Sequence, residues 1–377
     1  MSGITFYKGS EKSELSIETL QNEMAKYLQS DNLSFLLGAG CSSNIVNKKE
    51  TGISGMAGLY KEFFKKNKDF KVVGQLTEDK FDNNLEKMLE TMGAVQVVNQ
   101  LHDVDSRIEE KISTVQKFLR KKIVAGLKSE EVKKIYKDFY SKITQRSRRS
   151  PISVFTTNYD MFNEIALDEL GFPYNNGFSG TYRRKFNPVS YHYTYVENMN
   201  LQEDVWEPVT SFFNLIKLHG SISWVRHEDG IWEQDFKTIK HDKTVMIYPT
   251  PLKDRSTLMT PYSDLFRAME NRIVQKNSTL IVLGYSFSDD HINRVILNGL
   301  SVPSFRLVVV NWGDNIEKLT KLNDPRIFVI YSEDKIHYFK NFVDKVLPKI
   351  HPDIEESIQQ RPVNELAKQF EQGDNDE

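Results

Sequence analysis

The sequence predicts an α/β protein built around an open, doubly wound and mostly parallel sheet. Its apolar segments are continuous runs of Val, Ile, Leu and Phe, which are typical of strands covered on both faces. Segments with helical spacing separate the later runs, as in chains that alternate strand and helix. The runs occupy residues 33–37, 152–156, 215–219, 244–248, 279–285, 305–311 and 326–331, and the helical segments occupy residues 290–300, 315–322 and 335–347.

Two further helical regions are predicted in the first half of the chain. Apolar residues recur at helical spacing between Ser16 and Gln29, before Asp31 and Asn32 break the pattern. In residues 59–150, apolar residues recur at steps of three and four among many charged ones, which predicts a helical insertion. We therefore expect an α/β domain from residues 1–58 and 151–335, a helical insertion at 59–150, C-terminal helices at 336–370 and a disordered tail at 371–377.

Composition limits the classes of partner. The chain has 377 residues and a formal net charge of −2, so no overall field attracts it to nucleic acid or to an anionic membrane. We expect neither sequence-specific nucleic-acid binding nor a membrane partner. No run reaches the roughly 18 to 20 apolar residues that span a bilayer, and residues 1–14 lack the apolar core of a signal peptide, which favours the cytoplasm. The single cysteine, Cys41, excludes an intrachain disulfide and a zinc centre built from paired cysteines.

Small or hydrogen-bonding residues stand at the ends of five predicted strands. They occur in GAGCS (38–42), FTTNYD (155–160), KLHGSISW (217–224) and GYSFSDDH (284–291), and at Asn311. Singly, each has a structural alternative: a tight glycine turn, an Asx turn or helix cap at Asp160, or a structural histidine at His219. Because open α/β sheets bind ligands at the carboxyl ends of their strands, we expect the five segments to form one site.

As an ordered set, GAGCS, TTNYD, HG, GYS and VVVN resemble the NAD-binding motifs of the sirtuin family, over roughly residues 30–331. The longer forms FTTNYD, KLHGSISW and GYSFSDDHI resemble the bacterial sirtuin-like (SIR2-like domain) branch found in antiviral NAD-consuming systems. The resemblance implies a Rossmann-like sheet and NAD⁺ as the substrate. The sequence departs from the family at TGISGM (51–56), which lacks the arginine usual in the mobile cofactor loop, and at Thr157, where the family motif has glutamine.

The resemblance implies catalytic roles for Asn158, Asp160 and His219. Asn158 would hold a ribose hydroxyl or a water, and His219 would act as a base near neutral pH. Asp160 would orient the nicotinamide end or keep the local field negative. Contacts to NAD⁺ are implied for Gly38, Ala39, Gly40, Ser42, Thr157, Gly284, Ser286 and Asn311. Cys41 falls at a variable position and receives no role.

The resemblance also bears on the reaction. Deacylating sirtuins carry a zinc module with two cysteine pairs, and here the helical insertion takes its place. The implied activity is that of a NAD⁺ hydrolase (NADase), without zinc, which releases nicotinamide and ADP-ribose as an effector of antiphage defence. Such a toxic activity needs control, which favours a homo-oligomer and a separate partner such as a HerA-type ATPase. An NAD-dependent protein deacylase or ADP-ribosyltransferase, and a non-catalytic module that binds NAD or ADP-ribose, stay open as alternatives.

Overall fold

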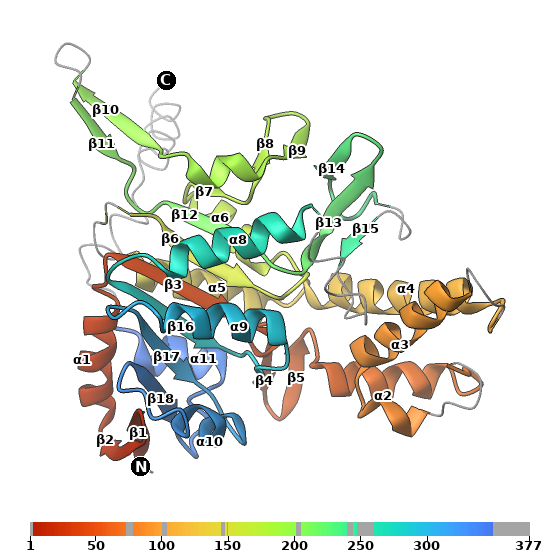
Figure 1. The fold of residues 1–377 in the computed structure, drawn as a ribbon, viewed down its shortest axis with the longest axis horizontal. Helices are drawn as coiled ribbons and strands as arrows, with labels where there is room; N and C mark the ends of the chain where they lie inside the picture. Colours follow the sequence, from red (N-terminus) through yellow and green to blue (C-terminus); the bar gives the residue numbers. More distant parts are fainter. Residues whose placement is uncertain are drawn as a thin grey trace, which may run out of the picture.

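The centre of the computed structural model is a nine-stranded sheet of order β2-β1-β18-β17-β16-β3-β6-β12-β7 (Figure 1). The strands from β18 to β7 are parallel, and β1 and β2 add antiparallel pairs at one edge. The structure describes residues 3–72, 78–99, 104–144, 148, 150–200, 205–239, 244–246 and 260–349. The strands are β1 (Ile4–Lys8), β2 (Glu11–Leu15), β3 (Asn32–Leu37), β6 (Ile152–Thr156), β7 (Tyr174–Asn175), β12 (Phe213–Lys217), β16 (Ser278–Leu283), β17 (Arg306–Val310) and β18 (Ile327–Tyr331). The predicted α/β fold with a mostly parallel sheet is confirmed.

The strands are continuously apolar because both faces of the sheet are buried. In β3, Phe35 and Leu37 belong to one hydrophobic cluster, while Leu36 between them belongs to the other. Helices α8 and α9 cover one face, and α1, α5 and α6 cover the opposite face (Figure 1). Their bounds are α1 (Ile17–Tyr27), α5 (Glu130–Ile143), α6 (Phe162–Leu170), α8 (Tyr262–Ile273) and α9 (Asp290–Gly299).

The chain order creates a switch point between β3 and β16, which are neighbours in the sheet. After β3 the chain continues to β6 on one side, whereas after β16 it continues to β17 on the other side. The turns that follow β3 and β16 therefore diverge from one crevice at the carboxyl end of the sheet. In open α/β sheets this is the place where ligands bind.

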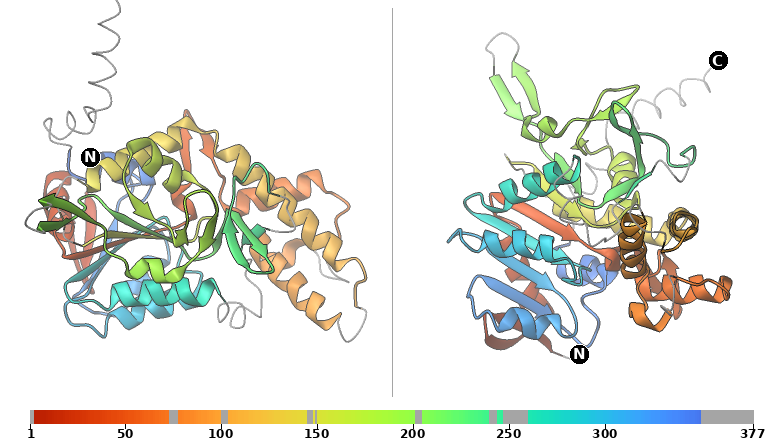
Figure 2. Two further views of the ribbon diagram at one scale, coloured as in Figure 1. Left: turned by 90° about the horizontal axis from the view of Figure 1, so that it is seen from above. Right: turned by 45° about the vertical axis from the view of Figure 1, so that its right-hand side comes forward.

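Helices α2 (Met56–Lys66), α3 (Leu85–Val98) and α4 (Ile108–Gly126) lie beside the sheet and pack around a hydrophobic cluster of their own (Figures 1 and 2). Phe63 lies at the centre of this cluster. Helix α5, which the sequence places in the same insertion, packs instead in the sheet's core, where Phe139 contacts Phe35. By packing, the separate helical unit comprises α2, α3 and most of α4, whose last turn adds Ile123 to the cluster of the sheet. The spacing of apolar residues is helical in α2, α3, α4 and α5 alike. It does not indicate which surface the apolar face of each helix covers, so the different packing of α5 could not be predicted.

The described part of the run at 244–248, residues 244–246, does not join the parallel sheet. Thr244–Met246 form β15, which pairs antiparallel with β13 (Gly220–His227) in a smaller sheet of order β15-β13-β14-β9-β8. A short apolar run fits a strand in either sheet, so composition alone could not separate them. The other strands of this sheet are β8 (Phe178–Ser179), β9 (Arg184–Phe186) and β14 (Gly230–Glu233).

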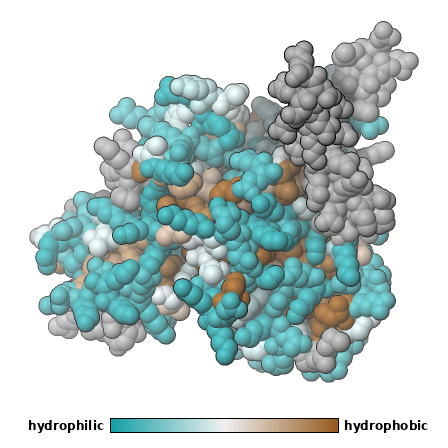
Figure 3. Space-filling view, turned by 180° about the vertical axis from the view of Figure 1, so that it is seen from behind, coloured by the Kyte–Doolittle hydropathy of each residue, from teal (hydrophilic) through white to brown (hydrophobic). Residues whose placement is uncertain are grey.

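The described part of the predicted C-terminal helices is a short helix α11 (Phe339–Asn341) followed by a π-helical turn at Phe342–Val346. Residues 350–377, including the predicted tail, lie outside the described residues. Among the helices that the structure describes, none is both long and apolar enough to traverse a membrane. The face shown in Figure 3 is mainly hydrophilic, with hydrophobic side chains in separate patches.

Candidate active site

A pocket of about 840 Å³ opens at the carboxyl ends of the parallel strands. The turns after β3, β6, β12 and β16 line it on the sheet side, and α2, α3 and α4 line it on the other side. Among the residues predicted for the site, those that line the pocket are Ala39, Gly40, Ser42, Thr157, Asn158, Asp160, His219, Gly284 and Ser286. Gly38 and Asn311 are not among the described residues that line it.

The glycines after β3 allow the turn after β16 to approach closely. A Cβ at Gly38 would lie 2.6 Å from the Tyr285 Cα, and a Cβ at Gly40 would lie 2.9 Å from the Gly284 Cα. Gly284 itself has φ +61°, a conformation that side chains disfavour. The glycines are therefore required by contact between two strand ends at the switch point.

The backbone donors of the turn after β3 are largely used within the protein. The Gly38 N–H donates to Leu283 O and the Gly40 N–H to Gly284 O, while the Cys41 and Ser42 N–H groups close the short 3₁₀ turn (Ala39–Cys41). The sequence predicts that such a turn aims amide groups at a ligand phosphate. In this structure, these four donors instead shape the wall of the pocket.

Three asparagine side chains hold successive carbonyl groups of the turn after β16. Asn311 Nδ2 donates to Tyr285 O at 3.0 Å, Asn315 to Ser286 O at 3.0 Å, and Asn293 to Phe287 O at 2.9 Å. Asn311 Oδ1 also accepts from the Trp312 N–H at 2.7 Å, so both ends of this amide bind backbone. Asn311 thus supports the turn rather than lining the pocket, and no sequence signal distinguished Asn293 and Asn315 from other polar helix residues.

Asn158 has a fixed orientation in a buried hydrogen-bond chain. Its Nδ2 donates to Gly38 O at 2.9 Å and to Ser42 Oγ at 2.8 Å, and Ser42 Oγ donates to Asp160 Oδ2 at 2.5 Å. Gly38 O can only accept, so the Asn158 NH₂ group must point to it. Asn158 Oδ1 has no hydrogen bond within the described residues and is the atom that remains for a ligand.

His219 is held by a carboxylate that sequence reasoning did not assign. Asp289 Oδ2 lies 3.0 Å from His219 Nε2, and both side chains are buried. Asp289 Oδ1 caps α9 by accepting from the N–H groups of His291 and Ile292. Because a carboxylate accepts, Nε2 carries the proton in the neutral imidazole, and Nδ1 keeps the lone pair. The one available signal was the small polar turn before α9, in which Asp289 is an N-cap residue.

A buried charge group lies behind Asp160. Lys217 Nζ donates to the Asp160 backbone carbonyl and forms an ion pair with Glu164 Oε1 at 2.9 Å. The pKa of the Asp160 carboxyl is raised, because burial outweighs the Lys217 charge and the Ser42 hydrogen bond, which both lower it. Burial likewise raises the pKa of Glu164, against the same lysine. Lys217 was missed because a lysine within an apolar run gives no indication of its partners.

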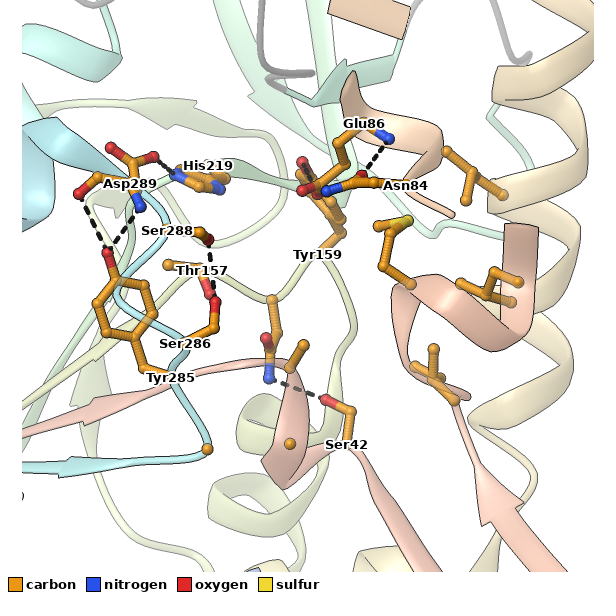
Figure 4. Close-up of a pocket in the computed structure, with 18 of the residues that line it drawn as sticks. Ser42, Asn84, Glu86, Thr157, Tyr159, His219, Tyr285, Ser286, Ser288 and Asp289 are labelled. Carbon is orange, nitrogen blue, oxygen red and sulfur yellow. Dashed lines mark hydrogen bonds and ion pairs between the residues drawn. The ribbon is translucent and has the colours of Figure 1, made fainter. Parts of the chain in front are cut away.

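The helical unit forms the wall opposite His219 and Asp289 (Figure 4). Asn84 caps α3, accepting the Glu86 N–H at 2.8 Å, and the Tyr159 hydroxyl lies 3.4 Å from Glu86 Oε1. Figure 4 shows Ser286 and Ser288 between the two walls, with their hydroxyl oxygens 2.9 Å apart. The pocket therefore combines polar groups from the sheet with a wall supplied by the insertion.

No cluster of three or more His, Cys, Asp or Glu residues suited to a metal ion occurs in the described ranges. A zinc-free site remains a prediction that rests on the cysteine count.

Residues 152–330 match the family described as the SIR2-like domain. The match begins at β6 and ends at β18, so it contains four of the five strand-end segments and leaves out GAGCS. No curated protein matches the chain. The match supports a sirtuin-like domain and use of NAD.

Proposed function

We propose that the protein hydrolyses the nicotinamide–ribose bond of NAD⁺ to give nicotinamide and ADP-ribose. The observation that carries the proposal is the presence of Asn158, Asp160 and His219 around one pocket, within a region that matches a SIR2-like domain. Among the described residues, two of these side chains keep an atom without a hydrogen-bond partner, Asn158 Oδ1 and His219 Nδ1, which is available for a substrate.

The reaction separates a neutral leaving group from a ribose that becomes oxocarbenium-like. The C1′–N bond breaks with its electron pair on nicotinamide, and a water oxygen bonds to C1′. Asn158 Oδ1 accepts a ribose hydroxyl and fixes the sugar. His219 Nδ1 takes the proton from water, while Asp289 stabilises the imidazolium that results. In its ionised form, Asp160 places a negative charge at this end of the pocket, which favours the cationic transition state.

The remaining predicted residues position the rest of NAD⁺. Ala39, Gly40 and Gly284 border the pocket where the two strand ends meet, and the Ser286 hydroxyl faces the same space. We assign the phosphate and adenosine-ribose end to this region, with Asn311 acting through the turn that it supports. The nicotinamide end then lies between Asp160, His219 and the wall formed by the helical unit.

The test is to incubate the purified protein with NAD⁺, with and without its genomic neighbour's product, and to quantify nicotinamide and ADP-ribose. Release of both products in equal amounts supports the proposal. Release that requires an acyl-lysine peptide would indicate a deacylase, and label transferred to protein would indicate an ADP-ribosyltransferase. NAD⁺ binding with no turnover under any of these conditions would indicate a binding module.

We further propose that the activity serves antiphage defence in the cytoplasm and is controlled by homo-oligomer formation and by a separate partner such as a HerA-type ATPase. Exposed apolar side chains on and beside the hairpin of β10 (Val196–Asn200) and β11 (Val205–Pro208) suit a protein contact, notably Trp206, Tyr193 and Val196. Light scattering and co-purification with the ATPase test this. A strict monomer with full activity would contradict it.

A further inference from the structure

Lys217 is the most deeply buried charged side chain near the pocket, with none of its surface exposed. It lies at the end of β12, two residues before His219. Its ammonium group binds Asp160 O and Glu164 Oε1, and the Met161 sulfur lies 3.9 Å away. The Lys217 ammonium therefore contacts Asp160, one of the residues proposed for catalysis, from within the protein core, and it does not border the pocket.

Stability does not explain this arrangement. A buried ion pair loses its hydration, and apolar residues of similar volume usually pack at least as favourably. The pairing is also incomplete, because Glu164 Oε2 is buried and has no hydrogen-bond partner in the part of the chain that the structure describes. A charge kept under these conditions calls for a role other than packing.

The Lys217 ammonium donates to the backbone carbonyl of Asp160, and its charge lowers the pKa of the Asp160 carboxyl. The other titratable groups near this carboxyl are Glu164 from α6, Cys41 from the turn after β3 and Tyr136 from α5. Burial raises the pKa of Cys41 and of Tyr136, so both stay neutral. In the ionised form, the Asp160 carboxylate accepts hydrogen bonds from the Ser42 hydroxyl and the Phe162 N–H.

We propose that Lys217 is a positioning residue: its buried charge holds Asp160 as an anion, so that Ser42 donates to Asp160 and stays available to accept from Asn158 Nδ2. Ser42 Oγ then joins Gly38 O as the second acceptor that keeps Asn158 Oδ1 toward the substrate. An ionised Asp160 can only accept a hydrogen bond from the Ser42 hydroxyl. Ser42 Oγ therefore uses its own proton for Asp160 and accepts a hydrogen bond from Asn158 Nδ2. A protonated Asp160 could instead donate a hydrogen bond to Ser42 Oγ. The Ser42 hydroxyl would then be free to donate its hydrogen bond to a different acceptor. The effect on the substrate rests on the proposed NAD⁺ cleavage, whereas the effect on Asp160 does not.

The first experiment needs no enzymatic activity. Lys217→Met alone would leave Glu164 buried without its cation, so the variant to use is the double replacement Glu164→Gln/Lys217→Met. Its matched control is Glu164→Gln, which keeps the lysine. Each is paired with a version that also carries Asp160→Asn, and the unfolding free energies of all four proteins are measured by chemical denaturation across a pH series.

Without Lys217, the folded-state pKa of Asp160 rises further above its unfolded value. Protonated Asp160 then adds to the free energy of unfolding at low pH, and this contribution is lost as the pH rises through the folded-state pKa. We expect the double variant to lose stability with rising pH relative to its Asp160→Asn partner, with a much smaller loss in the Glu164→Gln pair. Equal pH dependence in the two pairs would overturn the proposal.

The second experiment measures nicotinamide release. We expect kcat of the double variant to be at least about tenfold below that of Glu164→Gln, with KM for NAD⁺ changed by less than about threefold. Equal kcat values would contradict the role of Lys217 in positioning Asn158. If the wild-type protein releases no nicotinamide, the proposed reaction fails, and the stability comparison still decides whether Lys217 controls Asp160.

Discussion

His219 Nε2 lies 3.0 Å from Asp289 Oδ2, and the second oxygen of the same carboxylate caps α9. One side chain therefore fixes both the orientation of the imidazole and the start of the helix after β16. This contact joins the turn after β12 to the turn after β16. It also assigns the proton to Nε2, which leaves Nδ1 as the basic atom.

Asp289→Asn should lower kcat by about 10² or more, the range for loss of an oriented acid–base group. The asparagine Oδ1 can still cap α9, so stability should change little. Its NH₂ group would face His219 Nε2 and favour the tautomer with the proton on Nδ1. Steady-state kinetics and thermal unfolding measure the two effects. Asp314→Asn is the matched control, since Asp314 also precedes a helix, is exposed and is not among the described residues that line the pocket; equal kcat losses in both variants would contradict the assignment.

Asn158→Ala should lower kcat by about 10² to 10³, the usual cost of losing one preorganised polar group at a reacting centre. The change removes Oδ1, the atom proposed to hold the ribose. Because Asn158 is also bonded to Gly38 O and Ser42 Oγ, circular dichroism must show an intact fold. A folded variant with the kcat of the wild type would exclude Asn158 from the reaction.

Ser286→Ala and Asn311→Ala should both weaken NAD⁺ binding, but in distinguishable ways. Ser286 is exposed and its hydroxyl binds only Ser288 Oγ among the described residues, so its loss should raise KM by about threefold to tenfold with kcat and stability nearly unchanged. Asn311 holds the turn itself, so its loss should also cost about 1 kcal/mol of unfolding free energy. Kinetics with parallel denaturant titrations test this. A stability loss confined to Ser286→Ala would reverse the assignment.

Gly38→Ala should destabilise the protein by about 1 to 3 kcal/mol, because the new methyl group would overlap the backbone of Gly284 and Tyr285. Gly58→Ala is the control, and it should change the free energy of unfolding in the opposite direction. Gly58 is exposed in α2, where a Cβ has room, and alanine should stabilise the helix by about 0.5 to 1 kcal/mol. Urea denaturation compares the two variants. A neutral Gly38→Ala would mean that the strand ends are further apart than described.

The sequence was sufficient to predict six strands of the parallel sheet and their carboxyl ends, but not the edge strands β1, β2 and β7. Continuous apolar runs such as 152–156 mark strands buried on both faces, and small polar residues after them mark the carboxyl edge. The sheet to which a strand belongs was not predicted for β15, because a short apolar run fits a strand in either sheet. The packing of α5 was missed for a related reason: its apolar face has the same spacing whether it covers the sheet or another helix.

The supporting residues of the candidate site could not be predicted in the same way. Asp289 and Lys217 act through partners that are 70 and 57 residues away in sequence. Neither residue type is informative by itself, since an aspartate before a helix is an ordinary cap. Pairwise geometry was required to show that these side chains hold His219 and Asp160.

The most direct test of the account is the rate of nicotinamide release from NAD⁺ by the wild-type protein and by His219→Ala, each with and without the candidate partner. The account predicts release by the wild type and a kcat lower by about 10² to 10⁴ in the variant, with an unchanged fold and little change in KM. A folded His219→Ala variant that released nicotinamide at the wild-type rate would contradict the proposed mechanism.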